Sequence, residues 1–414
     1  MNGHHVLVIS LQVGDSASKG HLNPLVGVVQ HLLARGHRVS WLPLPAAVGP
    51  ADRAQLAEVG VELLDTPALP AGILAGPRQM AAVARDPARV WAVYHSFLLA
   101  PVPHLLEDVR ALLDRLRPDV AVVDTMSYPG IIACELAELP WVGVCAGLKL
   151  VHPPGFGPAY RGDMSAVVAP RADLFARYGL DPDFRLFECP SPTANVVFGT
   201  EELVGNVSPP ANTSLVGPTI TPRHRGDETE FPFHLVPEDR QLVYASFGSV
   251  HTGLTIHGVV EALVEATGKL GACLVISSEA VDQRAEELPD HVITTCYAPQ
   301  LEMLAHADAF VTHGGANSVM EGLYSGVPLL VVPLASDQPL QARLVERAGA
   351  GIAVDPADLT TDSAMAALAR LLDPDGPIRH AVARVQKSYR ANDGARRAAE
   401  IVERVAAARG GARG

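Results

Sequence analysis

Cysteine is scarce in this sequence, and positive charge is in the minority. The five cysteines are odd in number and widely separated, and none forms a Cys-x-x-Cys pair: Cys134, Cys145, Cys189, Cys273 and Cys296. This placement argues against a disulfide framework or a structural zinc site, and it favours a reducing, cytoplasmic location. Asp and Glu number 45 against 32 Lys and Arg, a net charge of −13, which argues against a nucleic-acid partner.

Long apolar runs are also missing. The chain has no stretch of about 18 apolar residues, so we expect no membrane span. The first residues, MNGHHVLVISLQVGD, lack the basic segment and the small-residue cleavage site of a signal peptide, and they predict a first β-strand. Apolar residues still make up 48% of the chain, which is enough to bury a large core.

Strand-like apolar runs alternate with helix-like patterns along most of the chain. At roughly 150 residues per domain, 414 residues suffice for two or three domains. Strands are expected at 6–11, 39–44, 120–123, 141–145, 241–247, 272–277, 309–312 and 328–332, and helices at 25–35, 105–116, 130–137 and 257–269. This alternation predicts an α/β fold with parallel, doubly wound sheets.

The periodic pattern is interrupted between residues 209 and 240, where Pro, Thr, Arg, Glu and Asp dominate. The sequence therefore predicts one α/β domain over 1–215, a linker over 216–240, a second α/β domain over 241–378 and a helical segment over 379–414. That last segment carries nine basic and three acidic residues. On an Ala-rich helix, arginines spaced in this way indicate a solvated face rather than a phosphate site.

Several short patterns resemble ligand-binding motifs but lack an essential feature. The glycines Gly248 and Gly253 have the spacing of a P-loop, but Leu254 stands where the phosphate-binding lysine is needed. Two Asp-Pro-Asp triplets, beginning at Asp181 and Asp373, resemble the Asp-x-Asp of metal-dependent sugar transferases. Asp-Pro pairs are common in turns without any metal, so we predict no metal site.

The most informative stretch is a glycine-rich turn from a strand into a helix. The strand at 309–312 is followed by His313-Gly-Gly-Ala-Asn-Ser318. Such a turn aims free backbone N–H groups and the positive end of the helix dipole at one point, which suits a diphosphate. Glu321 follows one turn into the helix. Asp337 and Gln338 follow the next strand, at the carboxyl edge where ligands of open α/β sheets bind.

Each of these positions also has a purely structural interpretation. Ser318 and Glu321 have the spacing of a helix capping box. The glycine pair suits a simple tight turn, and Asp337 suits a loop. The joint arrangement favours the ligand-binding interpretation.

The stretch from Tyr297 to Gln338 resembles the nucleotide-sugar signature of the inverting UDP-glycosyltransferase family, which includes plant secondary-product and bacterial antibiotic glucosyltransferases. That signature is an aromatic residue, Pro-Gln, His-x-Gly-x-Asn-Ser-x-x-Glu and Asp-Gln. Gly20-His-Leu-Asn-Pro24 and Phe247-Gly-Ser249 also match, so the resemblance extends over the whole chain. It implies the GT-B fold, with two Rossmann-like domains, a cleft between them, and a last helix that crosses back onto the first domain.

The resemblance also implies a role for each matching residue. One departure is that Tyr297 replaces the tryptophan common in plant members, although a smaller ring still stacks on a base. In this assignment Tyr297 stacks on the nucleobase, Gln300 and Glu321 bind the ribose, Ser249, His313, Gly315, Asn317 and Ser318 hold the diphosphate, and Asp337 and Gln338 bind the sugar hydroxyls.

His21 is the candidate catalytic base. It lies after the first strand, in what we expect to be a loop, and a histidine titrates close to the pH at which a base must work. Asp124 ends the strand at 120–123, so it opens on the same sheet edge and can orient the imidazole. In the family, the matching histidine and an aspartate after such a strand form this dyad.

We therefore expect an inverting transferase that moves a hexose, with glucose favoured, from a UDP-sugar to a hydroxyl of an apolar small-molecule natural product such as a polyketide or macrolide. The nucleotide sugar is a co-substrate, and no cofactor or metal is required. Of the 21 aromatic residues, twelve lie between Trp91 and Phe198, which suits an apolar acceptor. The alternatives are a dTDP-deoxysugar transferase, a nucleotide-sugar epimerase or glycolipid-assembling transferase on the same fold, and a non-catalytic nucleotide-sugar-binding homologue.

Overall fold

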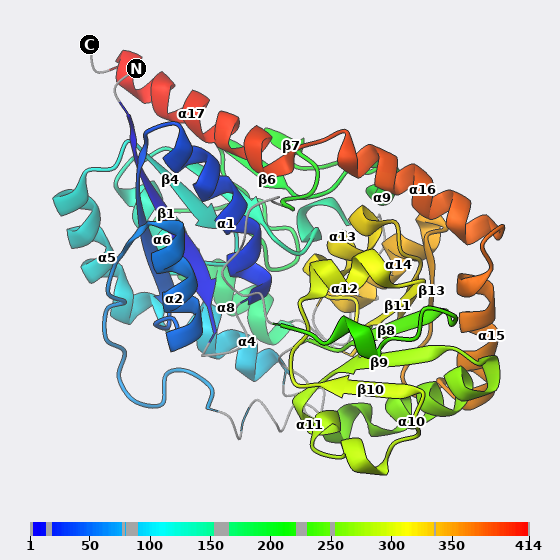
Figure 1. The fold of residues 1–414 in the computed structure, drawn as a ribbon. Coiled ribbons are helices and arrows are strands. Elements are labelled where there is room, and N and C mark those ends of the chain that lie inside the picture. The colour runs from blue at the N-terminus through cyan, green and yellow to red at the C-terminus, as the bar shows by residue number, and fades with distance from the viewer. Residues whose placement is uncertain are drawn as a thin grey trace. The chain divides into compact units, whose positions relative to one another are not determined.

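The computed structural model describes residues 3–13, 19–76, 79, 90–152, 165–220, 230–248, 253–334 and 337–412 (Figure 1). The chain forms two compact units. The first comprises residues 1–198, 207–219 and 394–414, and the second comprises residues 199–206 and 220–393.

The first unit is built on a sheet of parallel strands, in the order β3-β2-β1-β4-β5-β6-β7 among the described residues. The central strands are buried on both faces, which explains why their sequences are continuous apolar runs rather than alternating apolar and polar residues. Its strands are β1 (His5–Gln12), β2 (Arg38–Pro45), β3 (Glu62–Leu63), β4 (Val120–Asp124), β5 (Trp141–Cys145), β6 (Ala194–Val197) and β7 (Thr213–Leu215).

Helices connect these strands and cover the sheet. In α5, for example, Leu105, Val109 and Leu112 recur on one face and are buried, and this helix packs on α6. The helical segments of the first unit are α1 (Lys19–Ala34), α2 (Pro50–Val59), α4 (Val90–Leu98), α5 (Val102–Leu116), α6 (Tyr128–Leu136), η2 (Lys149–Val151), α8 (Ser165–Ala176) and α17 (Gly394–Ala412).

The second unit repeats the plan with a parallel sheet in the order β10-β9-β8-β11-β12-β13. Its strands are β8 (Leu242–Ser246), β9 (Cys273–Ser277), β10 (Val292–Thr295), β11 (Ala309–Thr312), β12 (Leu329–Val331) and β13 (Gly351–Ala353). Its helical segments are α9 (Glu201–Val204), η3 (Phe233–Leu235), α10 (Gly253–Leu270), α11 (Glu279–Asp282), η4 (Ala285–Glu287), α12 (Gln300–His306), α13 (Ala316–Ser325), α14 (Gln338–Ala348), α15 (Thr361–Leu372) and α16 (Pro377–Arg390).

These two parallel α/β units confirm the expected fold class. The limits of the units differ in detail from the expected divisions at 215, 241 and 379. The short helix α9 packs on α14 and α16, which assigns residues 199–206 and the helix α16 to the second unit. The strands β3, β6, β7, β10 and β13 were not expected, and each is short.

The last helix, α17, belongs to the first unit, where it packs along α1 (Figure 1). Its start is closely fitted, because the Gly394 N–H donates to the Pro218 carbonyl at 2.9 Å. A Cβ on Gly394 would lie 2.1 Å from the Gly217 carbonyl oxygen, so only glycine fits there. Arg35, which directly follows α1, pairs with Glu403 of α17 at 2.6 Å.

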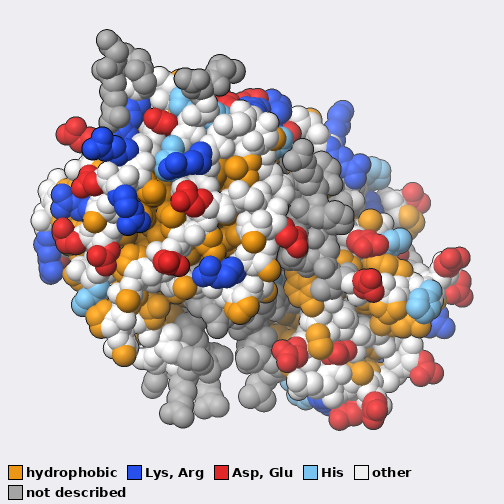
Figure 2. Space-filling model, turned by 60° about the vertical axis from the view of Figure 1, so that its left-hand side comes forward, with side chains coloured by type: hydrophobic (Ala, Val, Ile, Leu, Met, Phe, Trp, Pro, Cys, Tyr) orange, Lys and Arg blue, Asp and Glu red, His pale blue; other side chains and the backbone are white. Residues whose placement is uncertain are grey.

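Several charges of the C-terminal segment are paired with other groups of the protein. Arg396 pairs with Glu400 one turn along the same helix, and Arg409 donates to the Pro118 carbonyl. On the face shown in Figure 2, Lys and Arg side chains are interspersed with Asp and Glu side chains. Within the described ranges, no helix is both long enough and apolar enough to cross a membrane.

Candidate functional site

His21 and Asp124 meet at the topological switch point of the first sheet. Strands β1 and β4 are parallel neighbours, with Ile9 opposite Val123, and the strand order reverses between them. His21 lies in the helix that follows β1, and Asp124 is the last residue of β4. Both residues therefore stand at the carboxyl edge, where open α/β sheets bind their ligands.

A short hydrogen bond joins these two side chains. His21 Nδ1 lies 2.6 Å from Asp124 Oδ2, and the backbone N–H of Met126 donates to Asp124 Oδ1 at 2.9 Å. Because a carboxylate oxygen only accepts, Nδ1 carries the hydrogen and the neutral ring presents its lone pair at Nε2. Asp124 is buried, whereas 24% of the His21 side chain is exposed, so the imidazole is held from behind and open to a ligand.

The surroundings act on the pKa of His21 in opposite directions. Burial lowers the pKa because it disfavours the imidazolium. The charge and hydrogen bond of Asp124 outweigh that effect, and the pKa is raised above its usual value. The pair therefore favours proton uptake by His21.

His21 lies in the first turn of α1 and not in a loop, contrary to the sequence-based expectation. Gly20 and Pro24 disfavour a helix, and Pro24 lies inside α1. The helix is nevertheless formed because Leu22, Leu25 and Val29 pack in the core. Tertiary packing thus outweighs the local preference and fixes His21 on a rigid element.

A buried ion pair adjacent to the dyad was missed by the sequence analysis. Lys149 Nζ lies 3.3 Å from Glu188 Oε1, and only 3% of each side chain is exposed. The Thr125 hydroxyl, next in sequence to Asp124, donates to Glu188 Oε2. The available signal was a single charge within an apolar segment, as in Leu148-Lys149-Leu150 and Phe187-Glu188-Cys189.

In the second unit, the predicted donor residues gather at the carboxyl edge of its sheet. The strand order reverses between β8 and β11, which are parallel neighbours. Gly248 follows β8, and His313 follows β11. This edge is therefore the switch point of the second sheet, equivalent in topology to the position of the dyad in the first.

The imidazole of His313 packs directly against the backbone of two glycines, Gly315 and Gly248. A Cβ on Gly315 would lie 2.6 Å from His313 Nε2, and a Cβ on Gly248 would lie 2.9 Å from it. Gly248 and Gly314 both have positive φ, at 74° and 84°. The glycine-rich turn thus lets the ring pack directly against the backbone at the start of α13.

Gln300, Ser318 and Glu321 come together beside α13. Gln300 Nε2 lies 2.6 Å from Glu321 Oε2 and 3.4 Å from Ser318 Oγ, and Glu321 is buried. The N-cap of α13 is Gly315, without a side-chain cap. The capping-box interpretation of Ser318 and Glu321 is therefore wrong, because Ser318 lies inside the helix and Glu321 bonds to Gln300.

Asp337 and Gln338 lie where α14 begins. Asp337 is the half-buried N-cap of that helix, and Gln338 Oε1 accepts a hydrogen bond of 2.6 Å from the backbone N–H of Leu334. Asn317 is half-buried in the first turn of α13. Tyr297, after β10, is 45% exposed. Ser249 lies outside the described residues.

The Asp373 triplet is explained by a turn. Its second aspartate, Asp375, donates its backbone N–H to Asp373 Oδ1 at 3.1 Å. In the other triplet, Asp183 forms an exposed ion pair with Arg185 at 3.2 Å. Within the part of the chain that the structure describes, no three His, Cys, Asp or Glu side chains are grouped as metal ligands.

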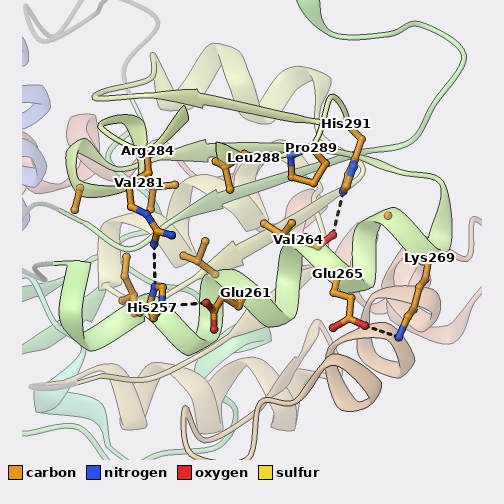
Figure 3. A pocket seen from close by; sticks show the side chains of 14 residues that line it. His257, Glu261, Val264, Glu265, Lys269, Val281, Arg284, Leu288, Pro289 and His291 are labelled. Carbon is orange, nitrogen blue, oxygen red and sulfur yellow. Dashed lines mark hydrogen bonds and ion pairs between the residues drawn. The ribbon is translucent and has the colours of Figure 1, made fainter. Parts of the chain in front are cut away.

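A separate pocket of about 890 Å³ lies between α10 and the segment from α11 to β10 (Figure 3). Its lining is mainly apolar, with Val260, Val264 and Leu288 among the contributors. The polar groups at its rim pair with one another, as in the His257–Glu261 and Glu265–Lys269 pairs. None of the predicted donor residues lines this pocket.

Comparison with known proteins relates this geometry to a family. The family model described as "UDP-glucoronosyl and UDP-glucosyl transferase" matches residues 229–381, which contain the predicted donor residues from Tyr297 to Gln338. The chain is 25% identical over 410 residues to the NDP-glycosyltransferase YjiC of Bacillus licheniformis, covering 97% of this chain and 98% of the relative. It is 26% identical to the zeaxanthin glucosyltransferase of Pantoea ananas, covering 93% of each chain.

The solved structure of the glycotransferase of kitacinnamycin superposes with a TM-score of 0.75 at 27% identity, covering 98% of this chain and all of that chain. Both parallel sheets therefore have counterparts in a known glycosyltransferase. This chain is a glycosyltransferase whose residues 229–381 match the UDP-glycosyltransferase family model, and its two α/β units have the GT-B fold.

Proposed function

We propose that this glycosyltransferase moves glucose from UDP-glucose to a hydroxyl group of an apolar small-molecule natural product, with inversion and without a metal. The observation that carries the proposal is the 2.6 Å hydrogen bond between His21 and Asp124 at the switch point of the first sheet. It supplies an oriented base, which is the group that sugar transfer to a hydroxyl requires.

His21 acts through Nε2, because Nδ1 is bonded to Asp124. The acceptor hydroxyl gives its proton to Nε2 while its oxygen attacks the anomeric carbon of the donor. The bond between that carbon and the diphosphate oxygen breaks in the same step, and UDP leaves. Asp124 stabilises the imidazolium that forms, as its effect on the pKa of His21 indicates.

The second unit binds the donor and stabilises the leaving group. The start of α13 directs backbone N–H groups toward the diphosphate, and no side chain caps it. His313, held by the adjacent glycines, adds a donor at the same point. Such fixed dipoles stabilise the negative charge that develops as UDP departs, which is the role a metal plays in other transferases.

Glucose and an apolar acceptor are supported by the sequence and by the relatives. The matched family is named for glucosyl and glucuronosyl transfer from UDP, and one full-length relative is a zeaxanthin glucosyltransferase. In this chain, Trp91, Tyr94, Phe97 and Phe187 form an aromatic cluster with ring centroids 4.7–5.8 Å apart. Phe187 immediately precedes Glu188, so this apolar cluster is next to the network around the dyad.

The test is an acceptor screen with UDP-glucose, read by mass spectrometry, with the wild type and His21→Ala in parallel. A product heavier by one hexose is expected from the wild type. The variant should lose about 10²–10⁴ in turnover, because the general base is gone, while UDP binding measured by calorimetry persists. Wild-type turnover in the variant would remove His21 from the mechanism.

A further inference from the structure

We propose that the buried Lys149–Glu188 ion pair is a positioning element for the His21–Asp124 dyad. It holds the turn from Asp124 to Met126 in place and balances the charge around the imidazole. The inference rests on the proposed function, because it assigns the pair to the reaction that His21 performs. Neither residue is a predicted site residue.

The first argument is the way the pair fastens the turn that carries Asp124. The Thr125 hydroxyl donates to Glu188, and Lys149 Nζ lies 3.3 Å from Met126 Sδ. The same Met126 donates its backbone N–H to Asp124 Oδ1. Thr125 and Met126, the two residues after Asp124, therefore each contact one member of the ion pair. A shift of the pair would move this turn and with it the Asp124 carboxylate that orients His21.

The segment that carries Glu188 is itself tied to the turn on both sides. The backbone N–H of Cys189 donates to the Thr125 carbonyl at 2.8 Å. The Tyr128 hydroxyl donates to the Phe187 carbonyl at 2.8 Å. These bonds hold Glu188 in register with Thr125, so the ion pair is a built feature and not an incidental contact of long side chains.

The second argument is electrostatic. Lys149 and Glu188 are both within range of His21, where the lysine lowers its pKa and the glutamate raises it. As an intact pair they act in opposite directions, and Asp124 has the larger effect on the pKa of His21. Lys19, at the start of α1, pairs with the buried Asp52 of α2 at 3.0 Å. Replacing only Glu188 would leave an uncompensated Lys149 charge acting on the base.

A buried ion pair is a poor source of net stability, because desolvation of the two charges offsets their attraction. Apolar residues of similar size would serve packing as well. The location of this pair beside the dyad is consistent with a role in positioning and charge balance. A purely structural pair would affect folding without lowering kcat at an unchanged donor KM, and that difference makes the proposal testable.

The test measures the pKa of His21 by NMR titration of histidine-labelled protein, the His21 signals being identified by their absence in His21→Ala. Glu188→Gln should lower this pKa by about 0.5–1 unit, because the Lys149 charge is left unopposed. It should also lower kcat by about 10-fold, with the donor KM unchanged, because the Asp124 turn is no longer held. The exposed Glu107→Gln, which removes the same charge from an ion pair with Arg110, is the matched control and should change neither quantity.

The double variant Lys149→Met/Glu188→Gln removes both charges. It should restore the pKa of His21 to within about 0.3 unit of the wild type, because no unpaired charge remains near the imidazole. The kcat should stay low, because the contacts that hold the Asp124 turn in place are still missing. A folded Glu188→Gln with wild-type pKa and kcat would overturn the inference. If that variant does not fold, Thr125→Val decides, because it keeps both charges and should still lower kcat several-fold at constant donor KM. Wild-type kcat in Thr125→Val would overturn the inference.

The two proposals fail in distinguishable ways. If His21→Ala retains wild-type turnover, the proposed mechanism fails, while the NMR titration still shows whether the pair controls His21. If His21→Ala is inactive and Glu188→Gln titrates and turns over like the wild type, only the role of the ion pair is overturned.

Discussion

His21 and Asp124 are 103 residues apart in the sequence, yet Nδ1 of the first lies 2.6 Å from Oδ2 of the second. One residue follows β1 and the other ends β4, and these strands are adjacent and parallel. The sheet therefore brings a base and the carboxylate that orients it to one edge. The relationship leads directly to a prediction about pH.

Asp124→Asn should lower kcat by about 10²–10⁴, because an amide neither fixes the tautomer nor stabilises the imidazolium. His21 must be neutral to accept a proton, so kcat/KM falls as the pH drops through its pKa. Asp124 raises that pKa, and its loss should move the acidic limb to lower pH. The residual activity of the variant, measured from pH 5 to 9, checks both effects. An acidic limb that stays in place would show that Asp124 does not control His21.

The same interaction predicts a pH dependence of stability. The pKa of His21 is raised in the folded state, so its pairing with Asp124 stabilises the fold fully below about pH 6.5, the ordinary value of a histidine. That contribution is lost as the pH rises through the raised pKa. Asp124→Asn should therefore reduce the Tm more at pH 5.5 than at pH 9. Equal losses in differential scanning calorimetry at the two pH values would contradict the linkage.

Gly315→Ala tests the packing of His313. The new Cβ would lie 2.6 Å from His313 Nε2, so the ring must move from the start of α13. We expect the donor KM to rise by about 10-fold, since a ring displaced by an ångström loses its alignment with the diphosphate. The matched control is Gly258→Ala in α10, where a Cβ meets nothing within 4 Å. It should stabilise the protein by about 0.5–1 kcal/mol and leave KM unchanged.

Glu321 predicts a preference for ribonucleotide donors. Its buried carboxylate accepts a 2.6 Å hydrogen bond from Gln300 and, in the proposed assignment, binds the 2′- and 3′-hydroxyls of ribose. A deoxyribonucleotide lacks one of these hydroxyls, a loss of about 1–3 kcal/mol in a dry site. UDP-glucose should therefore exceed dTDP-glucose by about 10-fold or more in kcat/KM.

Glu321→Ala should erase most of that preference. Steady-state kinetics with both donors measure it, and Ser318→Ala, which leaves the Gln300–Glu321 bond intact, is the control. Equal efficiency of the two donors in the wild type would assign Glu321 a structural role.

Activity should survive excess EDTA. In the mechanism proposed here, the leaving diphosphate is stabilised by the start of α13 and by His313. Initial rates with and without the chelator are the measurement, with the unchelated enzyme as reference. Loss of activity that Mn²⁺ or Mg²⁺ restores would overturn the metal-free mechanism.

The local pattern of the sequence determined the α/β fold and the donor motif. The buried strands β1, β4, β5 and β11 are continuous apolar runs, and the motif from His313 to Glu321 is contiguous, so both are visible without tertiary information. The short strands β10 and β13 escaped notice because they are only half-buried and lack a strong apolar run.

Tertiary structure alone decided which distant side chains meet. It placed His21 in a helix by burying that helix's apolar face, although Gly20 and Pro24 suggested a loop. It paired Gln300 with Glu321, and Lys149 with Glu188. A single charged residue within an apolar segment indicates that its side chain is buried. It does not indicate which other residue the side chain pairs with, because that depends on the order of the strands in the sheet. Parallel strands bring their carboxyl ends to one edge whatever their separation along the chain, and local periodicity carries no record of that order.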